Sequence, residues 1–152
     1  MDATTGREYT IKEAAALTGL PASTLRYYES IGVIAPIARG VSSKHRVYDE
    51  SDLDQVMWIA CLAATGMSVS DMRQYVANGQ LGPHAAQDQV QLLKAQQQRL
   101  AIEAEHLVLR QRYVRLKIDY WRAIDAGDEE RADLISGEAR LLADKLKQAK
   151  HQ

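Results

Sequence analysis

The feature that most constrains this chain is a long stretch of sequence without a single glycine or proline. It runs from Asp88 to about Ala126 and is rich in residues that favour helix, namely Gln, Leu, Arg, Glu and Ala. Apolar side chains recur in it at every seventh position, at Leu93, Leu100, Leu107, Val114 and Trp121. A helix over this stretch would be roughly 55 Å long at about 1.5 Å per residue. A chain of 152 residues cannot cover such a seam along its whole length, so the pattern predicts a partner helix.

The simplest partner is a second copy of the chain, which makes residues 88–125 a dimerisation coiled coil and the protein a homodimer. The row of positions four residues after the seam is mixed in character, with Gln97, Ala104, Gln111 and Ile118. The alternative is one long helix that folds back onto its own N-terminal part. Residues 79–87 are rich in helix breakers and predict a linker before this helix. Residues 126–152 predict a C-terminal helix and tail, with inward positions at Ala132, Ile135, Ala139, Leu142 and Leu146.

Composition narrows the class of protein further. With 46% hydrophobic residues the chain is too apolar to be disordered, and no apolar run approaches the ~20 residues that span a bilayer. The polar N-terminus lacks the apolar region of a signal peptide. One cysteine, Cys61, rules out an internal disulfide framework and an all-cysteine zinc site. We therefore expect a soluble protein of a reducing compartment, with no membrane association, no metal and no cofactor.

Residues 9–78 predict several short helices separated by glycine and proline. Thr10 and Glu13 have the spacing of a capping box, in which each side chain binds the backbone amide of the other residue. Gly19 ends this first helix, and Pro21 suits the first turn of the next. Two short helices joined by a tight turn that contains glycine are typical of a helix-turn-helix.

The second of these helices carries groups that suit DNA. Leu25 and Tyr28 can face a core, which leaves hydroxyls, a guanidinium and a phenol on the other faces. Phosphates and base edges require such groups. The alternative is an ordinary solvated face. We expect DNA contacts from this helix at Ser23, Thr24, Arg26 and Tyr27.

A basic segment follows this helix. Residues 37–48 contain no acid but four side chains that can carry positive charge, Arg39, Lys44, His45 and Arg46. Residues 40–43 have the composition of a hairpin tip, and a basic hairpin in this position is a wing that lays cations along a phosphate backbone. The net charge of −1 therefore averages over this basic segment and an acidic one, 49–54. The basic side chains of this segment can therefore meet a phosphate backbone.

The acidic segment suits the N-terminal dipole of a third helix. This helix is expected from about Glu50 to Thr65, with an inner stripe of Leu53, Val56, Met57, Ala60 and Ala64. A second capping pair, Ser68 and Asp71, opens a fourth helix. The helices and the hairpin can share one small core, so residues 9–78 predict a DNA-binding domain in a mainly α fold.

Several short sequence motifs within residues 9–53 occur together in this chain. They are Tyr9-Thr10-Ile11, Glu13-Ala14-Ala15, the run 19–29, Ile31-Gly32-Val33-Ile34, Arg46-Val47-Tyr48 and Asp52-Leu53. The block Thr24-Leu25-Arg26-Tyr27-Tyr28-Glu29 followed by Gly32 is highly specific. Together they resemble the MerR family of bacterial transcription regulators, and with the long helix the resemblance covers about residues 9–125.

The resemblance implies a winged helix-turn-helix domain, a long dimerisation helix in an antiparallel coiled coil, and a short C-terminal helix. It also implies that a homodimer binds an inverted repeat in double-stranded promoter DNA and distorts the DNA. RNA polymerase then engages the realigned promoter and is an indirect partner of the regulator. The location that follows is the bacterial cytoplasm, at the nucleoid. By position, the resemblance assigns DNA contacts to Arg26, Tyr27, Lys44, His45 and Arg46, and a phosphate contact to Thr10 at a helix N-terminus.

The resemblance does not identify the signal to which the regulator responds, but the cysteine content limits the candidates. Residues 88–152 hold no cysteine, which excludes a thiolate metal site there. Cys61 and the segment 116–121 resemble the branch of the family that responds to aldehydes, electrophiles and nitrosative stress. That resemblance implies a sensing thiol at Cys61, which must be accessible and partly ionised. The alternative is a buried cysteine that packs as a small hydrophobe.

Three further alternatives remain. A regulator of this class can instead bind a small ligand noncovalently near the coiled coil, in a pocket lined by Trp58, Tyr113, Tyr120 and Trp121, although these side chains also suit an interface core. An enzyme with Cys61 as nucleophile needs a base, and the four histidines form no cluster in the sequence. A pure coiled-coil interaction protein leaves residues 9–48 unexplained. We therefore expect a regulator and not an enzyme.

Overall fold

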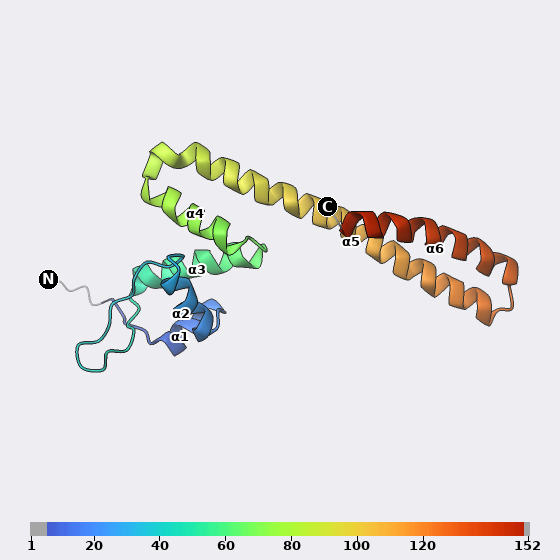
Figure 1. Cartoon of the computed structure of the whole chain (residues 1–152). Coiled ribbons are helices and arrows are strands. Elements are labelled where there is room, and N and C mark those ends of the chain that lie inside the picture. The colour runs from blue at the N-terminus through green and yellow to red at the C-terminus, as the bar shows by residue number, and fades with distance from the viewer. Residues whose placement is uncertain (1–5, 151–152) are drawn as a thin grey trace. The chain divides into compact units, whose positions relative to one another are not determined.

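The computed structural model describes residues 6–150, which form six α-helices and one short 3-10 helix (Figure 1). In chain order these are α1 (Ile11–Thr18), α2 (Ala22–Ser30), α3 (Glu50–Ala64), α4 (Val69–Gln80), η1 (Gly82–Ala85), α5 (Ala86–Asp125) and α6 (Glu129–Lys150). Among the described residues, β structure is limited to two isolated antiparallel bridges. The mainly α fold is thus confirmed.

The chain divides into two compact units, Met1–Lys94 and Ala95–Gln152. The first unit contains α1 to η1 and the start of α5, and the second contains the rest of α5 and α6. None of the helices within residues 6–150 combines the length and the apolar character that crossing a lipid bilayer requires.

The N-terminal unit begins with the helix-turn-helix of α1 and α2. The predicted capping box is present at α1, where the backbone N–H of Glu13 donates to Thr10 Oγ1 and that of Thr10 donates to Glu13 Oε1. Gly19 follows α1 with a φ of 82°, a left-handed conformation that glycine adopts without steric cost. Pro21 then precedes α2 as its N-cap. The local sequence signals therefore place both helices correctly.

The core of this unit gathers side chains from α2, α3, α4 and the segments between them. Its largest fully buried side chains are Tyr48, Leu25, Ile34, Ile59, Met72, Val33 and Val56. Along α3 the expected inner stripe is partly wrong, because Met57 is 44% exposed and Ala64 is exposed, whereas Ile59 is fully buried. Apolar residues occur on several faces of α3, so its spacing alone does not show which face meets the core.

The segment between α2 and α3 forms the predicted hairpin. Its two arms are joined at the bridge between Arg39 and Arg46. At the tip, Lys44 has a φ of 61°, a left-handed conformation that costs a residue with a side chain about 1–2 kcal/mol. A second bridge, between Tyr9 and Tyr48, joins the end of the hairpin to the segment before α1. The wing is therefore anchored in the backbone at its base.

Residues 79–87, expected to form a linker, are largely helical, because α4, η1 and α5 follow one another without an extended segment. Side-chain amides hold this turn: Gln74 Nε2 donates to Asn78 Oδ1 over 2.8 Å, and Asn78 Nδ2 donates to Gln89 Oε1 over 3.1 Å. Gln89 Nε2 in turn donates to the backbone oxygen of Tyr75 over 2.8 Å. The first contact lies within α4, whereas the two contacts of Gln89 join α5 to α4, and the helix preference of either segment does not include them.

In the C-terminal unit, α5 and α6 pack against each other around a second core. It consists of Leu116, Ala123, Ala132, Ile135, Ala139 and Leu142, with Leu109, Tyr113 and Tyr120 partly buried against it. The inward face predicted for α6 is therefore confirmed at four of its five positions, and Leu146 is half-buried. Gly137 lies in the middle of α6 and does not interrupt it.

Helix α5 thus presents two apolar faces. Because each residue advances by about 100° around a helix, Leu109, Leu116 and Ala123 of the α6-facing side lie nearly opposite the heptad seam, and Tyr113 and Tyr120 lie to one side of it. The five seam residues are between 38% and 64% exposed: Leu93, Leu100, Leu107, Val114 and Trp121. Packing of α6 on one face of α5 therefore leaves the predicted seam uncovered.

Candidate nucleic-acid interface

Helix α2 presents most of the predicted contact residues on its exposed side. Ser23 and Arg26 are exposed, and the Tyr27 side chain is 52% exposed, whereas Thr24 is half-buried. Leu25 is fully buried and holds the helix to the core. The spacing of the apolar residues in α2 therefore turns a guanidinium, a phenol and a hydroxyl outward, which is a set of groups that DNA phosphates and base edges bind.

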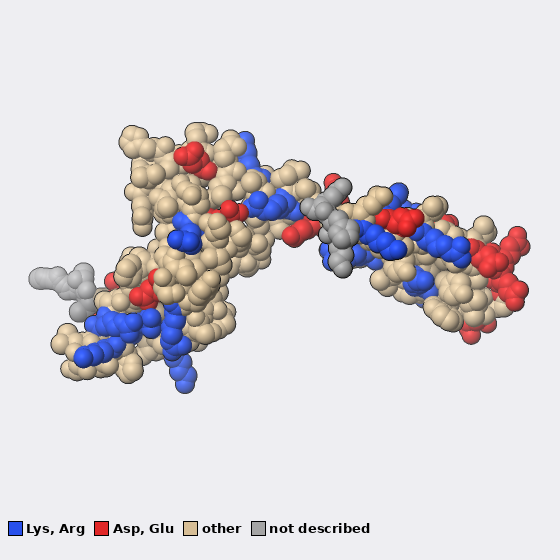
Figure 2. Space-filling model, viewed as in Figure 1, with Lys and Arg blue, Asp and Glu red and all other residues tan. Residues whose placement is uncertain are grey.

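The wing adds three exposed basic side chains, Arg39, Lys44 and His45. Across the hairpin tip, Arg39 Nη1 donates to the backbone oxygen of Lys44 over 3.3 Å. Figure 2 shows Lys and Arg side chains gathered on the side of the N-terminal unit that carries the wing, α1 and α2. A surface of this charge attracts a phosphate backbone.

Arg46 is placed differently from the other basic residues of the wing. Its Nε donates to Glu29 Oε1 over 2.6 Å, and the two side chains are only 18% and 15% exposed. The other carboxylate oxygen of Glu29 accepts from the backbone N–H of Ile37 over 3.2 Å. Burial acts to raise the pKa of Glu29, but the hydrogen bonds from Arg46 and Ile37 outweigh it and lower the pKa. Glu29 therefore binds the wing as a carboxylate, a role that is not evident from the sequence pattern.

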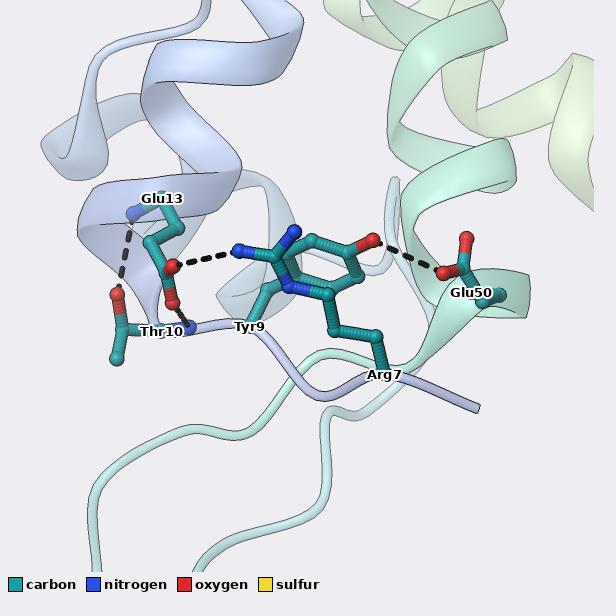
Figure 3. Close-up of polar contacts among 5 residues, drawn as sticks. All are labelled: Arg7, Tyr9, Thr10, Glu13 and Glu50. Carbon is teal, nitrogen blue, oxygen red and sulfur yellow. Dashed lines mark hydrogen bonds and ion pairs between the residues drawn. The ribbon is translucent and has the colours of Figure 1, made fainter. Parts of the chain in front are cut away.

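The segment before α1 contributes a second polar cluster, drawn in Figure 3. Arg7 Nη2 lies 3.5 Å from Glu13 Oε2, and the guanidinium carbon of Arg7 lies 4.9 Å from the centroid of the Tyr9 ring. The Tyr9 hydroxyl donates to Glu50 Oε1 over 2.9 Å, and this hydrogen bond raises the pKa of Tyr9. Thr10, the predicted phosphate contact, is exposed at this helix N-terminus and lies in the same cluster as Arg7 (Figure 3). Arg7 is an exposed cation that no sequence motif marks.

The acidic segment 49–54 lies at the start of α3, as expected, and two of its residues form a capping box that is not among the sequence-based expectations. Asp49 Oδ1 accepts from the backbone N–H of Asp52 over 2.8 Å, and Asp52 Oδ2 accepts from that of Asp49 over 3.0 Å. Burial is the largest cause of the raised pKa of Asp52. The two carboxylates therefore satisfy backbone amides at the start of a helix.

Cys61 is a free thiol on α3, exposed in the single chain, which favours the accessible thiol over the buried cysteine of the two alternatives. One helical turn before it, Trp58 packs edge to face on Tyr75 of α4, with ring centroids 5.4 Å apart. Among residues 6–150, no group of three or more His, Cys, Asp or Glu side chains is arranged to hold a metal ion.

The four aromatic residues expected to line a ligand pocket have different surroundings. Trp58 packs on Tyr75 within the N-terminal unit, and Tyr113 and Tyr120 pack against the core shared by α5 and α6. Trp121 is 64% exposed on the seam and meets the Tyr120 ring edge to face at 5.3 Å. It lines an open hollow of about 470 Å³ with Val114, Lys117, Ile118, Arg122 and Asp125. The C-terminal unit therefore gathers Trp121 with seam residues and leaves Tyr113 facing α6.

A helix-turn-helix, a basic wing anchored to it and a following long helix define a winged helix-turn-helix protein. Residues 9–79 match the family model described as MerR HTH family regulatory protein. A protein of Haemophilus influenzae named "Probable heavy metal-dependent transcriptional regulator" is 32% identical over 125 residues, which cover 82% of this chain and 94% of that protein. The chain belongs to the MerR family.

Other relatives agree with this assignment. The Bacillus subtilis regulator AdhR is 34% identical over 90 residues, 59% of this chain and 64% of AdhR. The crystal structure of HiNmlR, a MerR family regulator lacking the sensor domain and bound to promoter DNA, has the same fold, with a TM-score of 0.68 at 22% identity over 85% of this chain and 96% of that one. The chain spans between 51% and 64% of the length of the curated relatives YyaN, AdhR and SkgA. All are named as regulators, which leaves the cysteine-enzyme alternative without support.

Proposed function

We propose that this chain is a transcription regulator that binds double-stranded promoter DNA through residues 9–78. The observation that carries the proposal is the exposed surface of α2, with Arg26 and Tyr27, in one compact unit with a wing that exposes Arg39, Lys44 and His45. A helix of this kind reads base edges in the major groove while wing cations bind phosphates. The HiNmlR structure, which was solved bound to promoter DNA, supports the same activity here.

The regulator acts as a homodimer, joined through residues 88–125. The support is the uncovered seam of α5, whose residues recur at intervals of seven on the side away from α6. Burying a leucine from such a seam contributes about 1.5–3 kcal/mol, so covering the seam with a second α5, in antiparallel orientation, favours association. Two copies then present two DNA-binding units to an inverted repeat.

The proposed mechanism is distortion of the promoter. A dimer that binds both half-sites of an over-long promoter spacer and bends or untwists it changes how RNA polymerase meets the two promoter elements. The polymerase is then an indirect partner, and the site of action is the bacterial cytoplasm, at the nucleoid. A signal molecule can change transcription only if it binds to, or reacts with, one conformational state of the dimer more favourably than the other.

The signal is an electrophile that reacts at Cys61. The support is that the thiol is exposed on α3, the helix whose start is tied to Tyr9 and to the base of the wing. With an aldehyde, the thiolate sulfur adds to the carbonyl carbon, and the carbonyl oxygen takes a proton from water to give a hemithioacetal. Noncovalent binding of a small ligand near the coiled coil is the second candidate, supported by the exposed Trp121 and the hollow beside it.

The test of DNA binding uses duplexes that the full chain selects from random sequence. We expect affinity to fall steeply with salt, because each phosphate contact releases counterions. Arg26→Ala should weaken binding to the selected duplex by between about fivefold and a hundredfold. Arg140→Ala, an exposed arginine on α6, is the matched control and should bind as the wild type does. Binding that is independent of salt, or normal binding by Arg26→Ala, contradicts the proposal.

A further inference from the structure

One carboxylate joins both arms of the wing to the recognition helix. Glu29 lies in the last turns of α2, and its Oε2 accepts from the backbone N–H of Ile37, where the outgoing arm begins. Its Oε1 accepts from Arg46 Nε on the returning arm, at 2.6 Å. The arms are also bridged to each other between Arg39 and Arg46. A single side chain therefore ties the hairpin, at two places, to the helix that precedes it.

The pair is largely shielded from solvent, with side-chain exposures of 18% for Arg46 and 15% for Glu29. A charged pair in such a place is costly to break from one side, because the remaining charge stays poorly solvated. Exposed ion pairs such as that of Arg7 with Glu13, whose side chains are 70% and 44% exposed, contribute little by comparison. The Glu29–Arg46 contact is therefore the stronger constraint on the N-terminal unit.

The basic residues of the wing consequently fall into two groups. Arg39, Lys44 and His45 are exposed and can meet phosphates directly. Arg46 is half-buried, and its Nε is engaged by a carboxylate. An acidic residue beside a DNA-binding surface repels phosphates, so Glu29 must have a role that outweighs this repulsion if the surface binds DNA.

We propose that Glu29 is a positioning residue that acts through Arg46 to hold the wing at a set distance from α2. The recognition helix and the exposed wing cations can then contact the same duplex at the same time. Because the wing is already ordered in the free protein, binding does not lose the entropy of ordering it. This inference rests on the proposed DNA-binding function. It assigns Arg46 to holding the wing, in addition to any contact with phosphate.

The proposal predicts an effect opposite in sign to simple electrostatics. Replacing an acid near DNA by a neutral residue removes repulsion and should strengthen binding. We expect Glu29→Gln to weaken specific binding instead, by roughly tenfold, because a charge-assisted hydrogen bond is lost and Arg46 is left without its counter-charge. Glu8→Gln, which neutralises an exposed acid of the same unit, is the matched control and should leave affinity unchanged or raise it.

The experiment measures affinity for the selected duplex against salt for the full chain carrying Glu29→Gln, Arg46→Gln or both. If the two residues act as one unit, the double variant binds no more weakly than the weaker single variant. Amide hydrogen exchange without DNA should accelerate in residues 38–47 of Glu29→Gln while α1 and α2 keep their protection. Unchanged protection of α1 and α2 separates a moved wing from a domain that fails to fold.

The outcomes are distinguishable. If Glu29→Gln binds as tightly as the wild type or more tightly, or if the losses of the two single variants add in the double variant, the positioning proposal is wrong while the proposed function survives. If the wild-type chain itself shows no salt-dependent DNA binding, the proposed function fails and the positioning proposal fails with it. Weakened binding by Glu29→Gln, with non-additive losses and faster exchange in the wing, supports the proposal.

Discussion

Thr10 and Glu13 cap the first helix reciprocally. The backbone N–H of Glu13 donates to Thr10 Oγ1 over 3.1 Å, and the backbone N–H of Thr10 donates to Glu13 Oε1 over 2.9 Å. Both bonds satisfy amides that the helix itself leaves unpaired. Because α1 packs on α2 and α3, this small contact bears on the placement of the whole helix-turn-helix.

The first prediction concerns the stability of this cap. Thr10→Ala removes the side-chain acceptor, and we expect it to lower the free energy of unfolding by about 1 kcal/mol. Thr10→Ser keeps the acceptor and should retain most of the wild-type stability. Urea denaturation followed by circular dichroism measures both changes. Equal stability of Thr10→Ala and wild type would show that the cap contributes nothing.

The second prediction concerns pH. The pKa of Glu13 is lowered, chiefly by the backbone hydrogen bond from Thr10. A group whose pKa is lower in the folded chain contributes stability above its unfolded pKa, and this contribution is lost as pH falls through the folded pKa. Glutamine at this position keeps the capping geometry without titrating. The difference in unfolding free energy between wild type and Glu13→Gln should therefore shift against the wild type as pH falls below about 4.5, and a constant difference across this range contradicts the assignment.

The third prediction concerns assembly through the seam of α5. Leu100→Glu places a charge among apolar seam residues, and we expect the dimer dissociation constant to rise by roughly a hundredfold. Gln98→Glu adds the same charge two residues away, on an exposed position outside the seam, and is the control. Sedimentation velocity over a range of concentrations measures both. A dimer of Leu100→Glu with wild-type affinity would place the interface elsewhere.

The fourth prediction concerns the exposed thiol. In a reporter strain, we expect formaldehyde or methylglyoxal to change transcription through the wild-type chain and not through Cys61→Ser. Because the side chain is exposed, the substitution should change stability by less than about 0.5 kcal/mol, so loss of response is not loss of fold. An unchanged response of Cys61→Ser removes the thiol proposal and favours the noncovalent ligand. Thermal melting of the variant is the control for folding.

The fifth prediction contrasts two glycines of the C-terminal unit. At Gly137, inside α6, an added Cβ meets no atom within 4 Å, so Gly137→Ala should raise the free energy of unfolding by about 0.5–1 kcal/mol. At Gly127, which has a φ of +75° in the turn before α6, Gly127→Ala should lower it by about 1–2 kcal/mol. Thermal and urea unfolding at fixed protein concentration measures both. The same sign for the two variants contradicts this account.

Much of the fold was predictable because the signals are local. The caps at Thr10, Asp49 and Ser68, and the breaks at Gly19 and Gly66, act within one turn of the helix that they delimit. The inward face of α6 follows from spacing alone, since it meets one neighbour. The inner face of α3 did not follow in the same way, because its apolar residues lie on more than one side. Met57, expected in the inner stripe, is exposed, and Ile59, which was not assigned to the stripe, is buried.

In the candidate site too, some features follow from local sequence and others depend on the tertiary fold. Exposure of Arg26 and Tyr27 follows from the apolar positions of α2, and the sequence indicated it. Glu29 and Arg46 are seventeen residues apart and meet only because the wing folds back along α2. The aromatic side chains expected in one pocket likewise differ in their neighbours, because α6 takes up one face of α5.

The sequence by itself determined the helices, their caps, the basic wing, the unpaired seam and the MerR resemblance, because each depends on residue type and short spacing. Only the tertiary structure decided which wing arginine is engaged by Glu29, that Cys61 is exposed, and which face of α5 remains open after α6 has packed. The physical reason is that burial and ion pairing depend on which segments, distant in sequence, pack against each other in the fold. The residue pattern of one segment does not specify which segments will be its neighbours.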